Sequence, residues 1–325
     1  MKYQSNELAR FSHQLSYAHQ NYKPHGHRVS AFKGIVIGGL GGSGIAGRIV
    51  ASYLQNISPV PIEIVSDYQL PAWADNKTLV ISSSYSGNTE ETLYMFEDGL
   101  QRSCPSLVLT TGGTLGEKAS AMDIPVYYAE KGYQPRMALG YSLTYLIKIF
   151  EELLGIELIG DIKGLIESLE KTDEFKNRAE GLFKKFEEGL NKKFVIVTDG
   201  STSAAGVRFC QQIQENAKGE AFQEEIPEAN HNAIESLYGP TSSNFIFLNG
   251  NIHERVSLRF DYLRKVVQKT GDSLYELTLN GRDLRQIIET IYVLDWLSLM
   301  IADAKEVNSV RIDNIEGLKK FLSDH

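Results

Sequence analysis

Short apolar runs alternate with helix-like segments along the first half of the chain. The first run begins at residue 34 and enters a glycine-rich turn, after which the pattern is helical up to residue 54. Further apolar runs lie at 62–65, 78–81, 106–109 and 124–128. Runs of this length, bounded by turn residues, are typical of buried strands. Since strands that alternate with helices form parallel sheets covered on both faces, the pattern predicts an α/β fold.

The same order of elements returns in the second half of the chain. Residues 194–197 (FVIV) precede a turn of small residues and a helix-like segment. Residues 245–248 (FIFL) precede another turn and the helical pattern of residues 256–267. We therefore predict a diverged tandem repeat of one α/β domain.

A charged, helix-prone segment at residues 167–193 separates the two repeats, and we predict that it is a solvated connecting helix. The chain has 325 residues, more than the ~250–300 at which single cores stop growing. The predicted organisation is therefore an N-terminal domain (1–153), a helical connection (154–192) and a C-terminal domain (193–325).

Charge and composition exclude several classes of protein. The formal net charge of -8 provides no basic surface for nucleic acid. No apolar run reaches the ~18–20 residues that span a bilayer, and the polar amino terminus lacks the apolar core of a signal peptide. Cys104 and Cys210 are too few and too far apart for a disulfide framework. We expect a soluble, cytoplasmic protein without nucleic-acid or membrane partners.

The turn at residues 39–44 (GLGGSG) fits the pattern GxGxxG, in which glycines let backbone N–H groups approach an anion at a helix start. By itself this motif is weak. Asp67 follows the next predicted strand at the spacing of the ribose-binding acid in dinucleotide-binding folds. A nicotinamide-dependent oxidoreductase is thus one alternative.

A second turn, at residues 84–92 (SYSGNTEET), carries hydroxyl groups at alternating positions before another helix. Hydroxyls and free N–H groups of a helix's first turn can surround a phosphate. Both turns follow parallel strands, so they can face one crevice. We predict that a sugar phosphate is bound there by Gly42, Ser43, Gly44, Ser84, Ser86 and Thr89. The alternative is that the hydroxyls only cap the helix. The turns of the second repeat have fewer hydroxyl groups, and we expect them to bind no phosphate.

These motifs resemble a known family. The two turns resemble the sugar isomerase (SIS) domain. Together with TTGG at 110–113, QPR at 134–136, QENAK at 214–218 and PEANHNAIE at 227–235, they are similar to bifunctional phosphoglucose/phosphomannose isomerases along nearly the whole chain. The resemblance implies two tandem SIS-type doubly wound α/β domains. It also implies interconversion of glucose 6-phosphate, and of mannose 6-phosphate, with fructose 6-phosphate.

The resemblance also assigns chemical roles to four residues. Glu215 is the expected base that moves a proton between C1 and C2, and His231 is the expected ring-opening group. Arg136 is expected to stabilise the enediolate charge. The functional lysine of the family's final helix aligns with Lys319, although Lys320 is adjacent. In such homodimers His231 completes the active site of the neighbouring subunit.

No cofactor or metal is expected. No spacing among the seven histidines, the two cysteines and nearby acids is typical of a metal site. A different alternative is a non-catalytic sugar-phosphate sensor that kept the SIS phosphate turns. The joint presence of Glu215, Arg136 and His231 argues against that interpretation.

Overall fold

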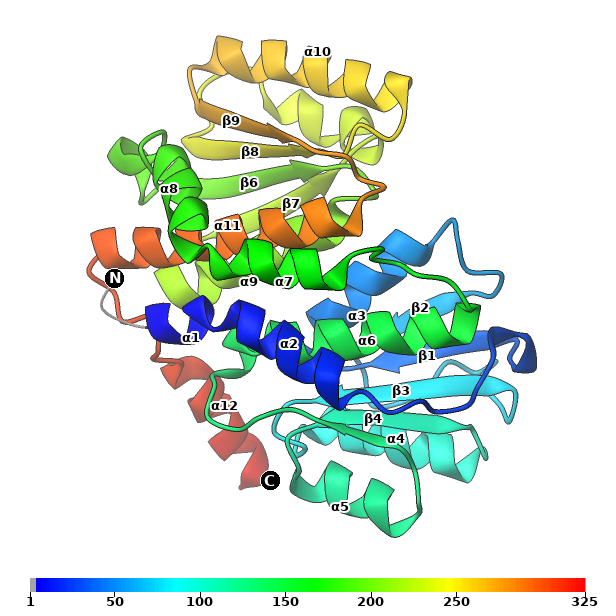
Figure 1. Ribbon diagram of the computed structural model, residues 1–325. Helices are drawn as coiled ribbons and strands as arrows, with labels where there is room; N and C mark the ends of the chain where they lie inside the picture. The colour runs from blue at the N-terminus through cyan, green and yellow to red at the C-terminus, as the bar shows by residue number, and fades with distance from the viewer. Residues whose placement is uncertain (1–3, 325) are drawn as a thin grey trace.

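The computed structural model describes residues 4–324, which form two parallel β-sheets on either side of a layer of helices (Figure 1). The first sheet has the strand order β2-β1-β3-β4-β5 and the second β7-β6-β8-β9. The first-sheet strands are β1 Gly34–Gly38, β2 Ile62–Val65, β3 Thr78–Ser84, β4 Ser106–Thr110 and β5 Val126–Tyr128. The second-sheet strands are β6 Lys193–Thr198, β7 Ala221–Glu225, β8 Ser243–Asn249 and β9 Ser273–Thr278.

Helices cover both faces of the first sheet. All residues of β1 and β3 are buried, as their continuous apolar runs predict. Successive strand side chains point to opposite faces. Ile35 therefore joins the cluster that contains α3 (Gly41–Leu54) and α6 (Leu139–Leu154), whereas Val36 packs in the cluster beneath α4 (Glu90–Gln101). The helix α5 (Gly113–Ala121) covers β4 on the same side as α4.

The second sheet repeats the topology of the first. Its order matches β2-β1-β3-β4 strand for strand, and α9 (Ser203–Ala217) follows β6 as α3 follows β1. The long helix α11 (Leu284–Ala304) packs beside α9, while α10 (Glu254–Thr270) covers the opposite face (Figure 1). The prediction of tandem parallel α/β units is confirmed.

The helices between the sheets belong to one apolar core. Contacts join α9 to α3 and join α2 (Phe11–Asn21) to α6. A single cluster of buried side chains runs from Ile35 of β1 through Phe209 of α9 to Ile246 of β8. The two sheets are therefore held in one arrangement, and side chains from both can meet at one site.

The connection between the sheets differs from the predicted solvated helix. Two helices, α7 (Ile162–Glu170) and α8 (Thr172–Phe183), occupy the segment, with Lys171 between them. Leu165, Leu169 and Phe175 are buried. Because apolar residues at helical spacing share one face, these helices pack that face on the core and turn their charges outward. The prediction of a solvated helix was wrong on this point.

Two strands and several short elements gave no apolar run in the sequence. The edge strands β7 (AFQEE) and β9 (SLYELT) are only partly buried, so polar residues alternate within them. The remaining helices are α1 Ser5–Ala9 and α12 Asp313–Ser323, with 3-10 turns at Val29–Ala31, Pro135–Met137, Glu187–Gly189, Glu228–His231 and Ala233–Ser236. No residue of α12 is buried.

Candidate active site

The two glycine- and hydroxyl-rich turns lie side by side at the carboxyl ends of β1 and β3. These neighbouring strands continue into helices on opposite faces, so they form the switch point where parallel α/β sheets bind ligands. In the common dinucleotide-binding order 3-2-1-4-5-6, β1 pairs with β2 and β4. Here it pairs with β2 and β3. Asp67 is exposed, and its carboxylate accepts a hydrogen bond from the N–H of Tyr68.

Glycine is required where the first turn closes. A Cβ atom on Gly42 would lie 2.5 Å from the carbonyl oxygen of Pro135, and one on Gly44 would lie 2.4 Å from that of Gly39. Both distances are shorter than van der Waals contact. Because Gly42 has no side chain, the start of α3 can pack directly against the loop that carries Arg136.

The hydroxyl groups of the second turn are already gathered. The Ser84 and Thr89 hydroxyls lie 2.8 Å apart, and Ser84 Oγ accepts the N–H of Gly87 at 3.1 Å. Ser43 Oγ accepts the N–H of Tyr85 at 3.0 Å, which ties the first turn to the second. Ser86 remains exposed at the rim. The predicted phosphate-binding residues thus converge from both turns.

The starts of the two helices remain open to an anion. The N-cap residues Leu40 of α3 and Thr89 of α4 make no side-chain capping bond to the described backbone. A helix's first-turn N–H groups need another acceptor when no cap is present, and a phosphate supplies one. In the alternative, the hydroxyls of Ser84, Ser86 and Thr89 only cap the helix: Thr89 makes no such bond, whereas Ser84 and Ser86 accept the N–H groups of Gly87 and Asn88 in the turn before α4.

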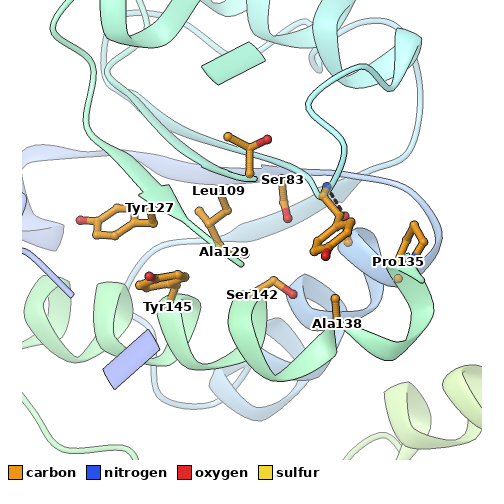
Figure 2. Close-up of a pocket in the computed structure, with 12 residues that line it drawn as sticks. Ser83, Leu109, Tyr127, Ala129, Pro135, Ala138, Ser142 and Tyr145 are labelled. Atoms are coloured by element: carbon orange, nitrogen blue, oxygen red, sulfur yellow. Dashed lines mark hydrogen bonds between the residues drawn. The ribbon is translucent and has the colours of Figure 1, made fainter. Parts of the chain in front are cut away.

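Behind the two glycine- and hydroxyl-rich turns lies a small cavity between the carboxyl ends of the strands and α6 (Figure 2). The side chains of Ser83 and Ser142 flank it from the sheet and the helix. Its volume of about 20 Å³ is enough for roughly one water molecule. This cavity is therefore too small to hold a sugar.

Arg136 joins this crevice to the second sheet. Its side chain is 4% exposed, and its Nη1 lies 3.3 Å from Oε2 of Glu215 at the end of α9. Its Nε donates to Oδ1 of Asn216 at 2.8 Å, and its Nη2 donates to the carbonyl oxygen of Ser309. Burial lowers the pKa of Arg136, while the Glu215 carboxylate raises it. The guanidinium is nevertheless charged at neutral pH.

Glu215 is accessible to a ligand. Its side chain is 27% exposed and lines a cavity of about 550 Å³ between the end of α9 and residues 307–315. A carboxylate that is partly exposed and faces a cation can take up and release protons at a bound substrate. The pairing of Glu215 with Arg136, 79 positions apart in the chain, brings two predicted catalytic residues together.

Lys218 shares this cavity and was not among the predicted site residues. Its ammonium donates to the carbonyl oxygens of Glu215 and Arg311. Burial and the nearby Arg136 charge lower the pKa of Lys218. Its spacing of three residues from Glu215 in a helical pattern was the signal that could have identified it.

His231 and Lys319 lie apart from this pair. Glu215 precedes β7 whereas His231 follows it in a 3-10 turn, and His231 does not line the cavity at Glu215. His231 is exposed. Lys319 is exposed on α12 and does not line the cavity at Glu215.

The equivalent crevice of the second sheet is filled by the protein itself. The buried carboxylate of Asp199 accepts the N–H groups of Ser201 and Thr202 through Oδ1 and that of Gly250 through Oδ2. The Ser201 hydroxyl also donates to it, at 2.6 Å. Asp199 thus takes the N–H groups that an anion would need. This accords with the expectation that the second switch point binds no phosphate.

Residues 4–324 contain neither a membrane-spanning helix nor a cluster of metal-binding side chains. No helix there combines the length and apolar character needed to cross a bilayer. Within the same residues, no three side chains among His, Cys, Asp and Glu form a group that could hold a metal ion.

Residues 175–322 match the model of the bacterial phospho-glucose isomerase C-terminal SIS domain. The bifunctional phosphoglucose/phosphomannose isomerase of Aquifex aeolicus is 32% identical over 309 residues, covering 91% of this chain and 92% of the relative. The D-glucosamine-6-phosphate 4-epimerase of Sulfolobus acidocaldarius is 32% identical over 209 residues, or 64% of this chain and 65% of the relative. A solved glucosamine-6-phosphate deaminase from Thermotoga maritima superposes with a TM-score of 0.73 and 14% identity, covering 94% of this chain and 95% of that one, and therefore shares the fold.

Proposed function

The chain belongs to the family of bifunctional phosphoglucose/phosphomannose isomerases, and from this premise we propose that it interconverts glucose 6-phosphate, and mannose 6-phosphate, with fructose 6-phosphate. The observation that carries the proposal is the pairing of Glu215 with Arg136 at 3.3 Å. A base and a cation for enediolate chemistry are thereby joined to the hydroxyl-lined turns through the contact between Gly42 and the Arg136 loop.

In the proposed complex, the phosphate binds at the starts of α3 and α4. The hydroxyls of Ser43, Ser84, Ser86 and Thr89 and the uncapped N–H groups surround it. These donors are neutral, so they hold the dianion by hydrogen bonds and by the positive ends of two helix dipoles. The sugar carbons then extend along Gly42 toward Arg136.

The proposed reaction proceeds through a cis-enediol. Glu215 removes the C2 proton of the open-chain aldose while the C1 carbonyl oxygen gains a proton. The O2 hydroxyl then loses its proton, and Glu215 returns a proton to C1 to give the ketose. Arg136 stabilises the negative charge that develops on the two oxygens. In the proposed complex, α12 brings Lys319 to the cavity at Glu215, where its ammonium supplies a second positive charge beside the enediolate.

We propose a homodimer as the active form. Within one chain, His231 does not line the cavity at Glu215, which supports a site completed by His231 of a neighbouring copy. The imidazole would open the sugar ring by giving a proton to the ring oxygen and accepting one from the O1 or O2 hydroxyl. No metal or nicotinamide is required for these steps. Two unpaired, buried cysteines accord with a cytoplasmic location.

Incubation with fructose 6-phosphate tests the proposal directly. The purified protein, with EDTA and without nicotinamide, should form glucose 6-phosphate and mannose 6-phosphate, which chromatography resolves. Glu215→Gln serves as the matched control for a contaminating isomerase. A wild-type protein that is protected by the sugar phosphate against thermal unfolding yet forms no product would be a sensor. Conversion that depends on added nicotinamide would favour an oxidoreductase.

A further inference from the structure

Asn216 connects Arg136 to the buried centre of the second sheet's helices. The residue is fully buried, and its side-chain oxygen accepts Nε–H of Arg136 at 2.8 Å. Its amide nitrogen donates to the hydroxyl of Ser298 on α11 at 2.9 Å. Ser298 in turn donates to the carbonyl oxygen of Asp295 at 2.7 Å. Each group in this chain has a defined partner, so the amide of Asn216 has one orientation.

A buried ion pair supports the same region from behind. Arg208 and Asp295 are 3% and 2% exposed, with Nη2 and Oδ2 2.6 Å apart. Nη2 of Arg208 also donates to the backbone carbonyl oxygen of Arg136 at 3.0 Å. Arg208 and Asn216, about two turns apart on α9, thus contact the backbone and the side chain of Arg136 respectively.

Stability does not account well for these buried polar groups. A buried ion pair is often no more stabilising than apolar residues of the same volume, because both charges lose their hydration. What this arrangement does supply is orientation. Asn216 holds Nε of Arg136, the Ser309 carbonyl holds Nη2, and Nη1 alone points to Glu215.

We propose that Asn216 is a positioning residue that fixes the plane of the Arg136 guanidinium, with Ser298 and the Arg208–Asp295 pair holding Asn216 and the Arg136 backbone in place. The inference rests on the proposed isomerase function. Arg136 belongs to the loop after the first sheet, whereas its orientation is set by α9 and α11 of the second. The packing of the two repeats against each other thus determines the geometry of the reacting end of the site.

The test replaces Asn216 and measures kcat and KM separately. Asn216→Ala should lower kcat by ~100-fold, the scale of a 1 Å misplacement of a catalytic group, with KM changed by less than ~3-fold. Asn216→Asp keeps an oxygen facing Nε and should recover at least ~10-fold of the lost kcat. The matched control is Asn244→Ala, another fully buried asparagine, which bonds the Gly189 carbonyl away from the site.

A double variant separates positioning from general loosening. If Asn216 acts only through Arg136, then Arg136→Ala with Asn216→Ala should be no slower than Arg136→Ala alone. Ser298→Ala is a gentler variant, should Asn216→Ala fail to fold, and should lower kcat by ~3–10-fold at constant KM.

Equal kcat losses for the Asn216 and Asn244 variants, or fully additive losses in the double variant, would overturn the positioning role while leaving the isomerase function intact. For the gentler variant, an unchanged kcat in Ser298→Ala would do the same. A wild-type protein without isomerase activity would overturn the proposed function, and this inference with it.

Discussion

Hydroxyl groups, rather than charged side chains, line the turns that we propose as the phosphate site of this acidic protein. Ser43, Ser84 and Thr89 are hydrogen-bonded to neighbouring groups before any ligand arrives. A phosphate would therefore exchange hydrogen bonds with preformed groups and would need little side-chain ordering.

Removing two of these hydroxyls should weaken binding and slow turnover. Ser86→Ala combined with Thr89→Ala should raise KM for fructose 6-phosphate by ~10–100-fold, because each lost hydrogen bond to a charged group contributes about 1.5–3 kcal/mol and neighbouring donors compensate in part. The kcat value should also fall, because phosphate binding energy orients the reacting carbons. Steady-state kinetics of the folded double variant provide the measurement. Unchanged kinetics would remove the turns from the proposed site.

The two proton-transfer roles can be separated by substrate. Glu215→Gln keeps the side-chain shape but removes the base, so kcat should fall by ~10²–10⁴-fold or more, and solvent deuterium should no longer enter C2 of the product. His231→Ala should slow hexose 6-phosphates far more than an open-chain tetrose phosphate, which has no six-membered ring to open. Equal losses of His231→Ala activity on both substrates, or near-normal exchange in Glu215→Gln, would contradict this assignment.

At the residue scale, the sequence located the glycine- and hydroxyl-rich turns but not the contact between Arg136 and Glu215, and phosphate binding by the turns stays a prediction. The residues of each turn lie within a few positions of one another in the sequence, so their spacing identifies the turn. The contact of Arg136 with Glu215 joins different repeats, and only the packing of α3 against α9 brings the two regions close. Lys218 was missed because one lysine after a helix resembles any solvated lysine. The places of His231 and Lys319 in the site depend on contacts beyond a single folded chain, and these roles stay predictions.

Among the elements, the strands with apolar runs were predictable, whereas the edge strands β7 and β9 were not. The runs of β1 and β3 are apolar throughout because helices cover both faces. The edge strands β7 and β9 expose part of their surface, so their patterns resemble loops. In α7 and α8, the many charged residues obscured an apolar face with helical spacing.

The final helix, α12, should be dispensable for folding but not for activity. Since no residue of 313–323 is buried, a chain ending at Ile312 should have a melting temperature within ~2 °C of the full chain. Its kcat should fall to the level of Lys319→Met in the full chain, if that lysine is what the helix contributes. Differential scanning calorimetry and steady-state kinetics measure the two effects. Full activity of Lys319→Met would exclude the lysine from the mechanism.

Glu130 links α2 and α6 to the loop before Arg136, and this link should weaken in acid. The hydrogen bond from Tyr141, opposed by partial burial and assisted by His13, lowers the pKa of Glu130 below its ordinary value of 4.5. The resulting stability is fully present above the ordinary value and is lost as pH falls through the lower value of the folded protein.

Urea unfolding of Glu130→Gln should therefore show a pH-dependent difference from the wild type. At pH 7 the variant should be less stable by about 1 kcal/mol, a typical net value for a hydrogen bond to a partly exposed charged group. The difference should shrink as the pH falls below 4.5, because the unfolded carboxyl takes up a proton first and the folded carboxyl follows at lower pH. A difference that stays constant between pH 7 and pH 3 would mean that the charge of Glu130 does not matter.

At the scale of the whole molecule, the two repeats have kept one topology and divided the chemistry. The first switch point offers open helix starts to an anion, whereas Asp199 fills the second. The second repeat instead provides Glu215 from the opposite end of its sheet. The repeated pattern in the sequence predicted that the two repeats share an order of strands and helices. It did not predict that the Asp199 carboxylate accepts the N–H groups at the second switch point.

Two inactive variants should restore activity together if the site spans two chains. Glu215→Gln and His231→Ala chains, mixed, unfolded and refolded, should regain about a quarter of wild-type activity. Random pairing in a two-fold dimer makes half of the dimers mixed, and each has one intact site of two. Either variant refolded alone is the control. Full activity of a wild-type monomer, sized by light scattering at assay concentration, would contradict the shared site.

The continuous core between the sheets also bears on how the chain is made. The ribosome releases the first sheet with α3 and α6 before α9, which packs on α3, has been synthesised. At ~5–20 residues per second, the roughly 60 residues from the end of α6 to the end of α9 take ~3–12 s to appear. Throughout that interval the nascent first repeat presents an uncovered apolar face to the cell. Because the two repeats share this layer of helices, the cell must protect the uncovered apolar face of the nascent first repeat, either with chaperones or by a rate of translation matched to folding.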